Sequence, residues 1–220
     1  MRQPEQYHPV DLSLQEIKRV LSGFSVHPTQ EQAAKIMQYV QLLLQWNRSV
    51  SLTSVTNPSE ILSRHFGESI FAASVVPIQK GRLADVGSGA GFPGLAIKIM
   101  RPELDLVLIE PNKKKAAFLW EVVRGLKLSP VDILTIRFED SIFADKDKFD
   151  FITARALGAL PELLDWSKRS LAEQGQVVLW LGMEDLTRMS KLADWVWSPG
   201  VRIPDSQRRF LLFGRPSARV

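Results

Sequence analysis

A glycine-rich turn between a short apolar run and a helix is the feature that most constrains this chain. Residues 83–86 read Leu-Ala-Asp-Val, and residues 87–94 read Gly-Ser-Gly-Ala-Gly-Phe-Pro-Gly. We predict a buried strand, a tight turn and a helix that starts near Pro93, where the missing N–H of proline costs nothing. Glycines let backbone N–H groups approach a ligand at the positive end of such a helix. The stretch predicts an α/β fold with a loop for a nucleotide or nucleoside cofactor.

From residue 82 onward the chain alternates between apolar strands and amphipathic helices, which predicts a mostly parallel, doubly wound sheet. The expected strands are 82–86, 105–110, 131–136, 149–153 and 176–181. The expected helices are 93–101, 112–126, 159–171 and 184–196. A last strand at 208–213 is expected to be antiparallel and at or near an edge, with its partner within 195–201.

Helix start signals precede the first strand, and each combines an N-cap side chain with a glutamate or glutamine in the first turn. They are Ser13-Leu14-Gln15-Glu16, Thr29-Gln30-Glu31-Gln32 and Asn57-Pro58-Ser59-Glu60. Residues 1–10 are expected to be frayed. We predict a helical cap over 1–78 that packs on a domain over 79–220 as one compact unit.

Composition narrows the class of protein. The chain has 220 residues, 45% hydrophobic and 24% charged, which suits a globular protein with a sizeable core. Its net charge of +4 permits a polyanionic partner. The absence of cysteine excludes disulfides, thiolate metal sites and a cysteine nucleophile, and no metal site is expected. The polar start and the lack of any membrane-length apolar run favour a cytoplasmic protein without membrane association.

The loop is compatible with two cofactors. Residues 89–94 satisfy the dinucleotide fingerprint, and Glu110 follows about twenty residues later, where a ribose-binding acid belongs. This pattern allows an NAD-dependent oxidoreductase. Asp85, at the strand end before Gly87 and Gly89, is instead typical of S-adenosylmethionine-dependent methyltransferases. A carboxylate repels the pyrophosphate of NAD and attracts the ammonium and sulfonium of S-adenosylmethionine, so the stretch favours the methyl donor.

Two further groups of residues end predicted strands, where ligands bind in doubly wound sheets. Arg137, Phe138 and Glu139 close the third strand and are expected to face the adenine of the cofactor. The alternative is a surface ion pair between Arg137 and Glu139. Arg155 ends the fourth strand, and we expect it to act at the cofactor or the substrate.

Three residues have open interpretations. His65 follows Ile61 by one helical turn on the buried side, so it is either a hydrogen-bonded core histidine or a substrate contact. Lys114 and Lys115 belong to a run of lysines that either forms a solvated helix face or binds phosphates. The arginines of the C-terminal tail are compatible with nucleic-acid binding.

Several blocks, in order, resemble the RsmG (GidB) family of methyltransferases, which modify guanine N7 in 16S ribosomal RNA. They are Trp46-Asn47, Leu52-Thr53, Arg64-His65-Phe66, residues 85–94, Lys114-Lys115-Ala116-Ala117-Phe118-Leu119, Arg137-Phe138-Glu139 and Ala154-Arg155-Ala156. The resemblance implies a Rossmann-like class I methyltransferase fold, S-adenosylmethionine as cofactor, and ribosomal RNA or the small ribosomal subunit as partner. We expect a monomer.

The resemblance also implies roles for individual residues. Gly87 and Phe92 line the cofactor site, Phe138 and Glu139 hold its adenosine end, and Arg155 contributes from the fourth strand.

Two positions depart from the family pattern. Ser51 replaces an asparagine, and Leu181 stands where the family has a lysine. If that lysine contacts RNA, the contact is lost or replaced here, so a non-catalytic RNA-binding or ribosome-binding protein remains an alternative.

The residue inventory fits transfer to N7 for a separate reason. Guanine N7 has a lone pair and no proton, so attack on a methyl group needs no general base, and no catalytic acid or base is expected. Orientation and desolvation can supply on the order of 7–11 kcal/mol of the barrier. Methylation of pyrimidine C5 usually needs a cysteine, and exocyclic-amine methylation a short Asn/Asp-Pro-Pro-aromatic motif; the chain has neither.

Overall fold

The computed structural model describes residues 12–217, so the expected fraying of residues 1–10 lies outside the described residues. The N-terminal part forms α1 (Leu14–Ser22), α2 (Gln30–Trp46) and a longer helix in three pieces. These pieces are α3 (Pro58–Ile61), the π-helical turn Leu62–Gly67 and α4 (Glu68–Val75).

The predicted caps are present. The side chains of Ser13, Thr29 and Asn57 accept the backbone N–H three residues ahead of each. Gln32 also returns a bond to the N–H of Thr29, which completes that capping box. Because these bonds satisfy donors that the first helical turn leaves unpaired, the three starts follow from local sequence alone.

An eight-stranded sheet follows, with strand order β3-β2-β1-β4-β5-β8-β6 and β7 paired with β8. The parallel strands are β1 (Gly81–Val86), β2 (Leu104–Ile109), β3 (Val131–Leu134), β4 (Phe149–Arg155) and β5 (Leu171–Gly182). The antiparallel strands are β6 (Trp195–Trp197), β7 (Val201–Arg202) and β8 (Arg209–Pro216). The order reverses between β1 and β4, which makes this pair the switch point where ligands bind in open α/β sheets.

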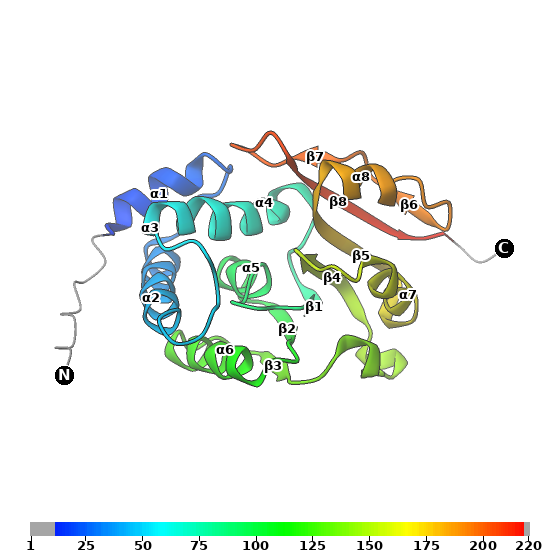
Figure 1. The fold of residues 1–220 in the computed structure, drawn as a ribbon, viewed down its shortest axis with the longest axis horizontal. Helices are drawn as coiled ribbons and strands as arrows, with labels where there is room; N and C mark the ends of the chain where they lie inside the picture. The colour runs from blue at the N-terminus through cyan, green and yellow to red at the C-terminus, as the bar shows by residue number, and fades with distance from the viewer. Residues whose placement is uncertain (1–11, 218–220) are drawn as a thin grey trace.

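Helices cover both faces of the sheet (Figure 1). They are α5 (Gly94–Met100), α6 (Lys113–Gly125), α7 (Leu160–Ser170) and α8 (Met183–Met189). Alternate side chains of β1 enter different cores: Leu83 packs with α2, α5 and α6, whereas Ala84 and Val86 pack with α7. The predicted doubly wound fold is therefore confirmed.

Two predicted elements were wrong in part. Residues 184–196 were expected as one helix, but α8 ends at Met189 and Trp195–Trp197 form β6. Trp197 pairs with Gly214 of β8, where any Cβ would overlap the Trp197 ring. This pairing across the sheet overrides the local helical pattern. The third strand also ends at Leu134 rather than at 136, and Phe138–Asp140 form a short 3₁₀ turn.

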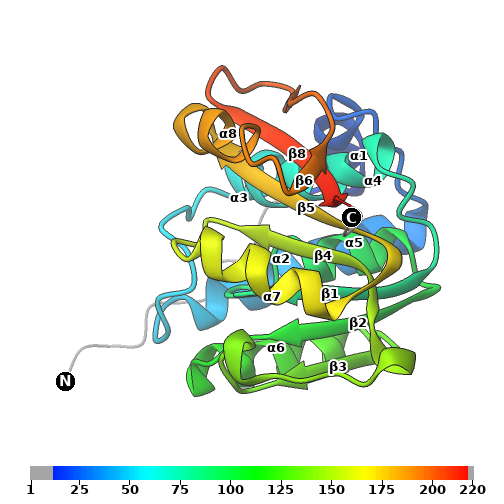
Figure 2. The ribbon, with the colours of Figure 1, turned by 90° about the vertical axis from the view of Figure 1, so that its right-hand side faces the viewer.

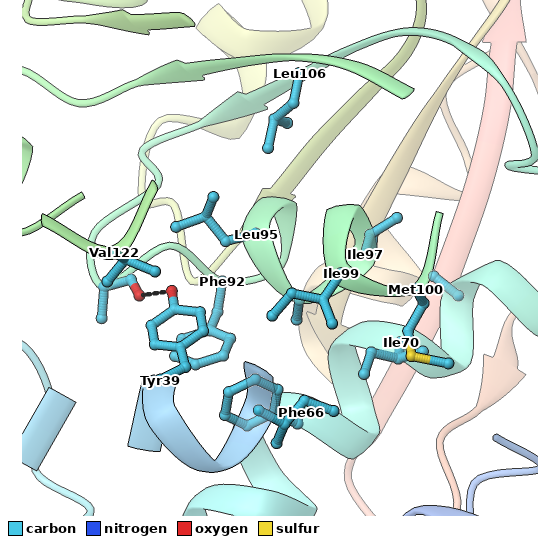
Figure 3. Packing of buried hydrophobic residues seen from close by; sticks show 14 of the residues in the cluster. Tyr39, Phe66, Ile70, Phe92, Leu95, Ile97, Ile99, Met100, Leu106 and Val122 are labelled. Carbon is cyan, nitrogen blue, oxygen red and sulfur yellow. Dashed lines mark hydrogen bonds between the residues drawn. The ribbon is translucent and has the colours of Figure 1, made fainter. Parts of the chain in front are cut away.

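The helical cap and the sheet share one core. Tyr39 of α2 lies among Phe66, Phe92 and Leu95, and Figure 3 shows the hydroxyl of Tyr39 bonded across to the loop. Gln32 donates to the carbonyls of Ile99 and Met100 at 3.3 and 3.4 Å. The division of the chain between residues 78 and 79 stays a prediction. Within 12–217, every helix is too short or too polar to cross a bilayer.

Candidate cofactor and substrate site

The glycine loop leaves β1 and turns sharply onto the end of β2. The backbone N–H groups of Gly87 and Ser88 donate to the carbonyl of Ile109 at 2.9 and 3.3 Å. Gly87 and Gly89 have φ angles of +68° and +57°, which favour glycine, and a Cβ on Gly89 would meet nothing closer than 3.7 Å. A Cβ on Gly87 would instead come 3.2 Å from Leu157, so the loop tolerates a side chain at Gly89 better than at Gly87.

Glu110 holds the loop against the next helix. One carboxylate oxygen accepts the N–H of Gly89 at 2.8 Å, and the other accepts the N–H of Asn112, the N-cap of α6, at 2.9 Å. Glu110 is only 5% exposed. Each carboxylate oxygen has a second lone pair, so the group keeps acceptor capacity for a ligand hydroxyl.

Asp85 lies beneath the loop and is fully buried. The hydroxyl of Thr153 on β4 donates to its carboxylate at 2.9 Å. Burial raises the pKa of Asp85 to about 7, although the bond from Thr153 opposes that rise. Gly94 packs on the carboxylate so closely that its Cβ would come 2.7 Å from the Cβ of Asp85. A polar Thr153 within an apolar strand is the sequence signal that could have identified this partner.

Phe92 stands at the centre of an aromatic stack between loop and cap. Its ring lies 5.3 Å from Tyr39 and 5.0 Å from His65, both nearly parallel, and 5.0 Å edge-on from Phe66. Figure 3 shows Tyr39 and Phe66 beside it. Phe92 is 7% exposed and packs between the loop and the cap, and its contact with the cofactor stays a prediction.

A chain of hydrogen bonds links Arg155 to the cap. Its guanidinium donates to Nδ1 of His65 at 2.7 Å and to the carbonyl of Arg64 at 2.8 Å. Since arginine can only donate, Nδ1 is the acceptor, and Nε2 carries the proton toward the hydroxyl of Thr53 at 2.8 Å. Burial and the charge of Arg155 lower the pKa of His65 to about 3.

Asn47 completes this chain. It accepts the N–H groups of Leu52 and Thr53 and donates to the carbonyl of Thr53. His65 is thus a buried, hydrogen-bonded histidine, as the first of its two interpretations predicted. Ser51 lies exposed in the same segment.

A pocket of about 290 Å³ opens beside Arg155, at the carboxyl ends of β4 and β5. It is lined by Arg64, Glu68, Ala154, Arg155, Ala156, Leu157, Leu160, Trp180, Leu181, Gly182, Asp185 and Arg209. Arg209 pairs with the buried carboxylate of Glu68 at 2.7 Å, and the indole of Trp180 donates to the carbonyl of Glu68. Burial raises the pKa of Glu68, while the charges of Arg209 and Arg155 oppose that rise.

Sequence reasoning missed most of this pocket. Glu68 and Arg209 lie 141 positions apart and meet only in the folded chain. Leu181 is one of the lining residues and is 5% exposed, so the departure from the family lies directly at this pocket.

The remaining predicted residues lie apart from this pocket. Phe138 is 7% exposed and packs edge-on against Trp166 at 5.8 Å. Glu139 pairs with Arg137 at 3.5 Å, as in the alternative of a surface ion pair. Their contact with adenine stays a prediction. Lys114 and Lys115 lie in the first turn of α6, where the side chain of Asn112 accepts both of their N–H groups.

The sheet order, the glycine loop and the carboxylate that holds it define a Rossmann-like class I methyltransferase fold. Solved structures share this fold. One is a SAM dependent methyltransferase from Aquifex aeolicus, with TM-score 0.59 and 16% identity over 70% of this chain and 92% of that chain. Another is a ribosomal protein L11 methylase from Lactobacillus delbrueckii subsp. bulgaricus, with TM-score 0.57 and 18% identity over 70% of this chain and 78% of that chain.

The chain belongs to the family of rRNA small subunit methyltransferase G (GidB), whose model matches residues 32–199. Relatives named ribosomal RNA small subunit methyltransferase G include one from Desulfitobacterium hafniense, 40% identical over 66% of this chain and 61% of that protein. The relative from Roseiflexus castenholzii is 38% identical over 70% of this chain and 66% of that protein. The relative from Acinetobacter baylyi is 31% identical over 90% of this chain and 95% of that protein. This chain therefore spans less than two thirds of the first two relatives' length.

Proposed function

We propose that this protein transfers a methyl group from S-adenosylmethionine to N7 of a guanine in small-subunit ribosomal RNA. The main support for this proposal is the loop over residues 85–94, which Glu110 holds at the β1–β4 switch point. The chain that carries this loop belongs to the rRNA small subunit methyltransferase G family. The names of the relatives support ribosomal RNA as the substrate.

The residues around the loop suit a cationic donor. Asp85 and Glu110 supply two carboxylates at the end of β1 and β2, and the bare backbone of Gly87 and Gly89 permits close approach. The same carboxylates would repel the pyrophosphate of NAD. We infer that Glu110 binds the ribose and that Asp85 favours the methionine ammonium.

When bound, S-adenosylmethionine supplies an electrophilic methyl group. The chain contributes orientation and exclusion of water. The pocket beside Arg155 has apolar walls, including Leu157, Leu160 and Leu181, that suit the flat face of a base. Because N7 carries a lone pair and no proton, no residue needs to remove a proton before attack.

Methyl transfer to small ribosomal subunits tests the proposal. Subunits from a strain lacking the activity are incubated with the protein and labelled S-adenosylmethionine, and N7-methylguanosine is mapped in the RNA. We expect one guanine to gain the label. Naked ribosomal RNA, run in parallel, identifies which form is the substrate, and light scattering tests the inferred monomer.

Calorimetry separates this proposal from its alternatives. Binding of S-adenosylhomocysteine without NAD binding supports the methyltransferase. Binding of NAD alone would indicate an oxidoreductase. Binding of S-adenosylhomocysteine without any transfer to RNA would indicate a non-catalytic RNA-binding protein. We further infer that the protein acts in the cytoplasm, where its substrate is assembled.

A further inference from the structure

The outward face of α6 carries an aromatic side chain between cations. Lys113, Ala117, Trp120 and Arg124 follow a spacing of four, three and four residues, so they share one side of the helix. Phe118, Leu119 and Val122 occupy the opposite, buried side. Lys127, just beyond the helix, is also exposed. We call Lys113, Lys114, Trp120, Arg124 and Lys127 the α6 strip.

Trp120 exposes much of its side chain to solvent on this face. It is 51% exposed, and among residues 12–217 its indole makes no hydrogen bond and stacks on no other ring. The other tryptophans of the described chain are more buried, as Trp166 and Trp195 illustrate at 1% and 5% exposure. A large flat ring displayed among cations offers a face on which a ligand can stack.

The strip also concentrates the charge of the molecule. Residues 112–127 contain five cations and one anion, Glu121, for a net charge of +4 that equals the net charge of the whole chain. The rest of the protein is therefore neutral on balance. Glu121 pairs with Arg124 at 2.6 Å, which leaves the three lysines at the start of the helix and Lys127 outside any ion pair among the described residues.

The strip begins beside the glycine loop. Asn112 caps α6 and donates its N–H to Glu110, which also accepts the N–H of Gly89. Lys113 and Lys114 therefore follow within four residues of the carboxylate that holds the glycine loop. With a rise of about 1.5 Å per residue, Trp120 lies roughly 10 Å further along the helix and Arg124 about 6 Å beyond it. Figure 2 shows α6 at the side of the molecule opposite α8.

We propose that the α6 strip binds RNA, with one unpaired base stacked on Trp120 and neighbouring phosphates bound by Lys113, Lys114, Arg124 and Lys127. This inference rests on the proposed function and names the surface that holds RNA outside the pocket. An unpaired base fits because stacking needs a free π-face, which a duplex hides. An acidic peptide would satisfy the cations but would leave the indole unused.

The first test is binding to a short, fluorescently labelled single-stranded RNA, at fixed salt, without methyl donor. Stacking of a base on an aromatic ring predicts that Trp120→Ala weakens RNA binding by about 5- to 150-fold, whereas Trp120→Phe stays within about threefold of the wild type. Ile142→Ala, at a 92% exposed apolar position away from α6, is the matched control and should leave affinity unchanged.

The phosphate contacts have their own signature. Each lost contact lowers the slope of log affinity against log salt by roughly 0.7 on single strands, so Lys113→Ala with Lys114→Ala should lower it by about 1.4. Lys18→Ala with Lys191→Ala removes the same charge from exposed positions elsewhere and should leave the slope near the wild-type value.

Cross-linking locates the RNA directly. RNA carrying 5-iodouridine is irradiated on the protein and the product digested with trypsin, which should release the cross-linked peptide over residues 116–124. Unchanged RNA affinity in Trp120→Ala, or a cross-link confined to other peptides, overturns the inference.

The two proposals can fail separately. Calorimetry with S-adenosylhomocysteine should give wild-type affinity for each α6 variant, which verifies an intact fold and cofactor site. RNA binding that depends on Trp120, without any methyl transfer by the wild type, would sink the proposed function and support the strip. If the wild type transfers methyl groups and Trp120→Ala binds RNA as tightly as the wild type, the proposed function is supported and the inference about the α6 strip is overturned.

Discussion

His65 accepts a hydrogen bond from Arg155 and donates one to Thr53, so its neighbours dictate its protonation state. Its side chain connects the cap to the end of β4 as a neutral imidazole with one fixed tautomer. A proton on Nδ1 would meet the guanidinium of Arg155 at 2.7 Å, which is why burial and that charge hold its pKa at about 3. The residue aligns Arg155 rather than moving a proton.

The stability of the protein should therefore depend on His65 at mildly acidic pH. The folded-state pKa of about 3 lies below the ordinary 6.5, so the unfolded state binds more protons in between, and stability falls as pH drops below 6.5. When the pH falls from 7 to 5, the free energy of unfolding should drop by about 2 kcal/mol less in His65→Gln than in the wild type. Urea unfolding at the two pH values measures this difference. His27→Gln, at an exposed position, is the control; equal losses in wild type and His65→Gln would contradict the assignment.

Asp85 has the opposite shift, because burial raises its pKa to about 7. A bound ammonium favours the ionised carboxylate, so binding near neutral pH should release a proton. We predict that affinity for S-adenosylhomocysteine rises about tenfold from pH 6 to pH 8. Calorimetry in two buffers of different ionisation enthalpy measures the proton. Asp85→Asn should abolish both the release and the pH dependence, and a dependence that survives in this variant would show that Asp85 is not the titrating group.

At the scale of elements, α2 contacts the glycine loop directly. The hydroxyl of Tyr39 donates to the carbonyl of Ala90 at 2.6 Å, while its ring stacks on Phe92. The cap thus touches the cofactor loop from behind, and changes in the cap should reach the cofactor site without any direct contact.

Tyr39→Phe isolates that hydrogen bond, because the ring and its stacking remain. The buried carbonyl of Ala90 loses its partner, which should cost about 1–3 kcal/mol of unfolding free energy and weaken S-adenosylhomocysteine binding. Chemical denaturation and calorimetry measure the two effects. Retained stability with wild-type affinity would mean that water replaces the hydroxyl.

Gly91 depends on the same contact. Its φ is +83°, and a Cβ there would overlap the Tyr39 hydroxyl and come 2.6 Å from Leu95. Gly91→Ala should cost roughly 2–5 kcal/mol from backbone strain and overpacking. Gly158→Ala is the matched control, since a Cβ there meets nothing within 4 Å, and it should stay within about 0.5 kcal/mol of the wild type in urea unfolding. Similar losses in both variants would argue against the crowding.

At the scale of the whole molecule, the cap and the sheet share one hydrophobic core. A single apolar cluster runs from Ile17 and Leu21 of α1 through Tyr39 and Phe66 to Leu106 of β2. Removing the cap would expose much of this core to water.

We predict one unfolding transition for the full chain, with the calorimetric and van't Hoff enthalpies equal. The fragment 79–220 expressed alone should show no cooperative transition at the same temperature. Two separated transitions, or a fragment that unfolds cooperatively, would contradict a shared core and support independent domains.

Elements whose signals are local were predictable. The caps at Ser13, Thr29 and Asn57 form bonds within three residues, and the strands β1 and β2 follow from continuous apolar runs. The second half of the expected helix 184–196 was wrong because Trp195–Trp197 pair with β8, a partner that no local pattern reveals. The π-helical turn that carries Arg64 and His65 likewise has no signature in the apolar spacing.

The sequence by itself determined the fold class and the loop at the end of β1, because glycines, Asp85 and Glu110 act within one strand–turn–helix unit and the strand beside it. Only the tertiary structure decided how Arg155, His65 and Thr53 align, and that Glu68 meets Arg209 beside Leu181. These side chains come from distant segments. Their distances and charges exist only after the core has formed, when burial turns separate polar residues into one network.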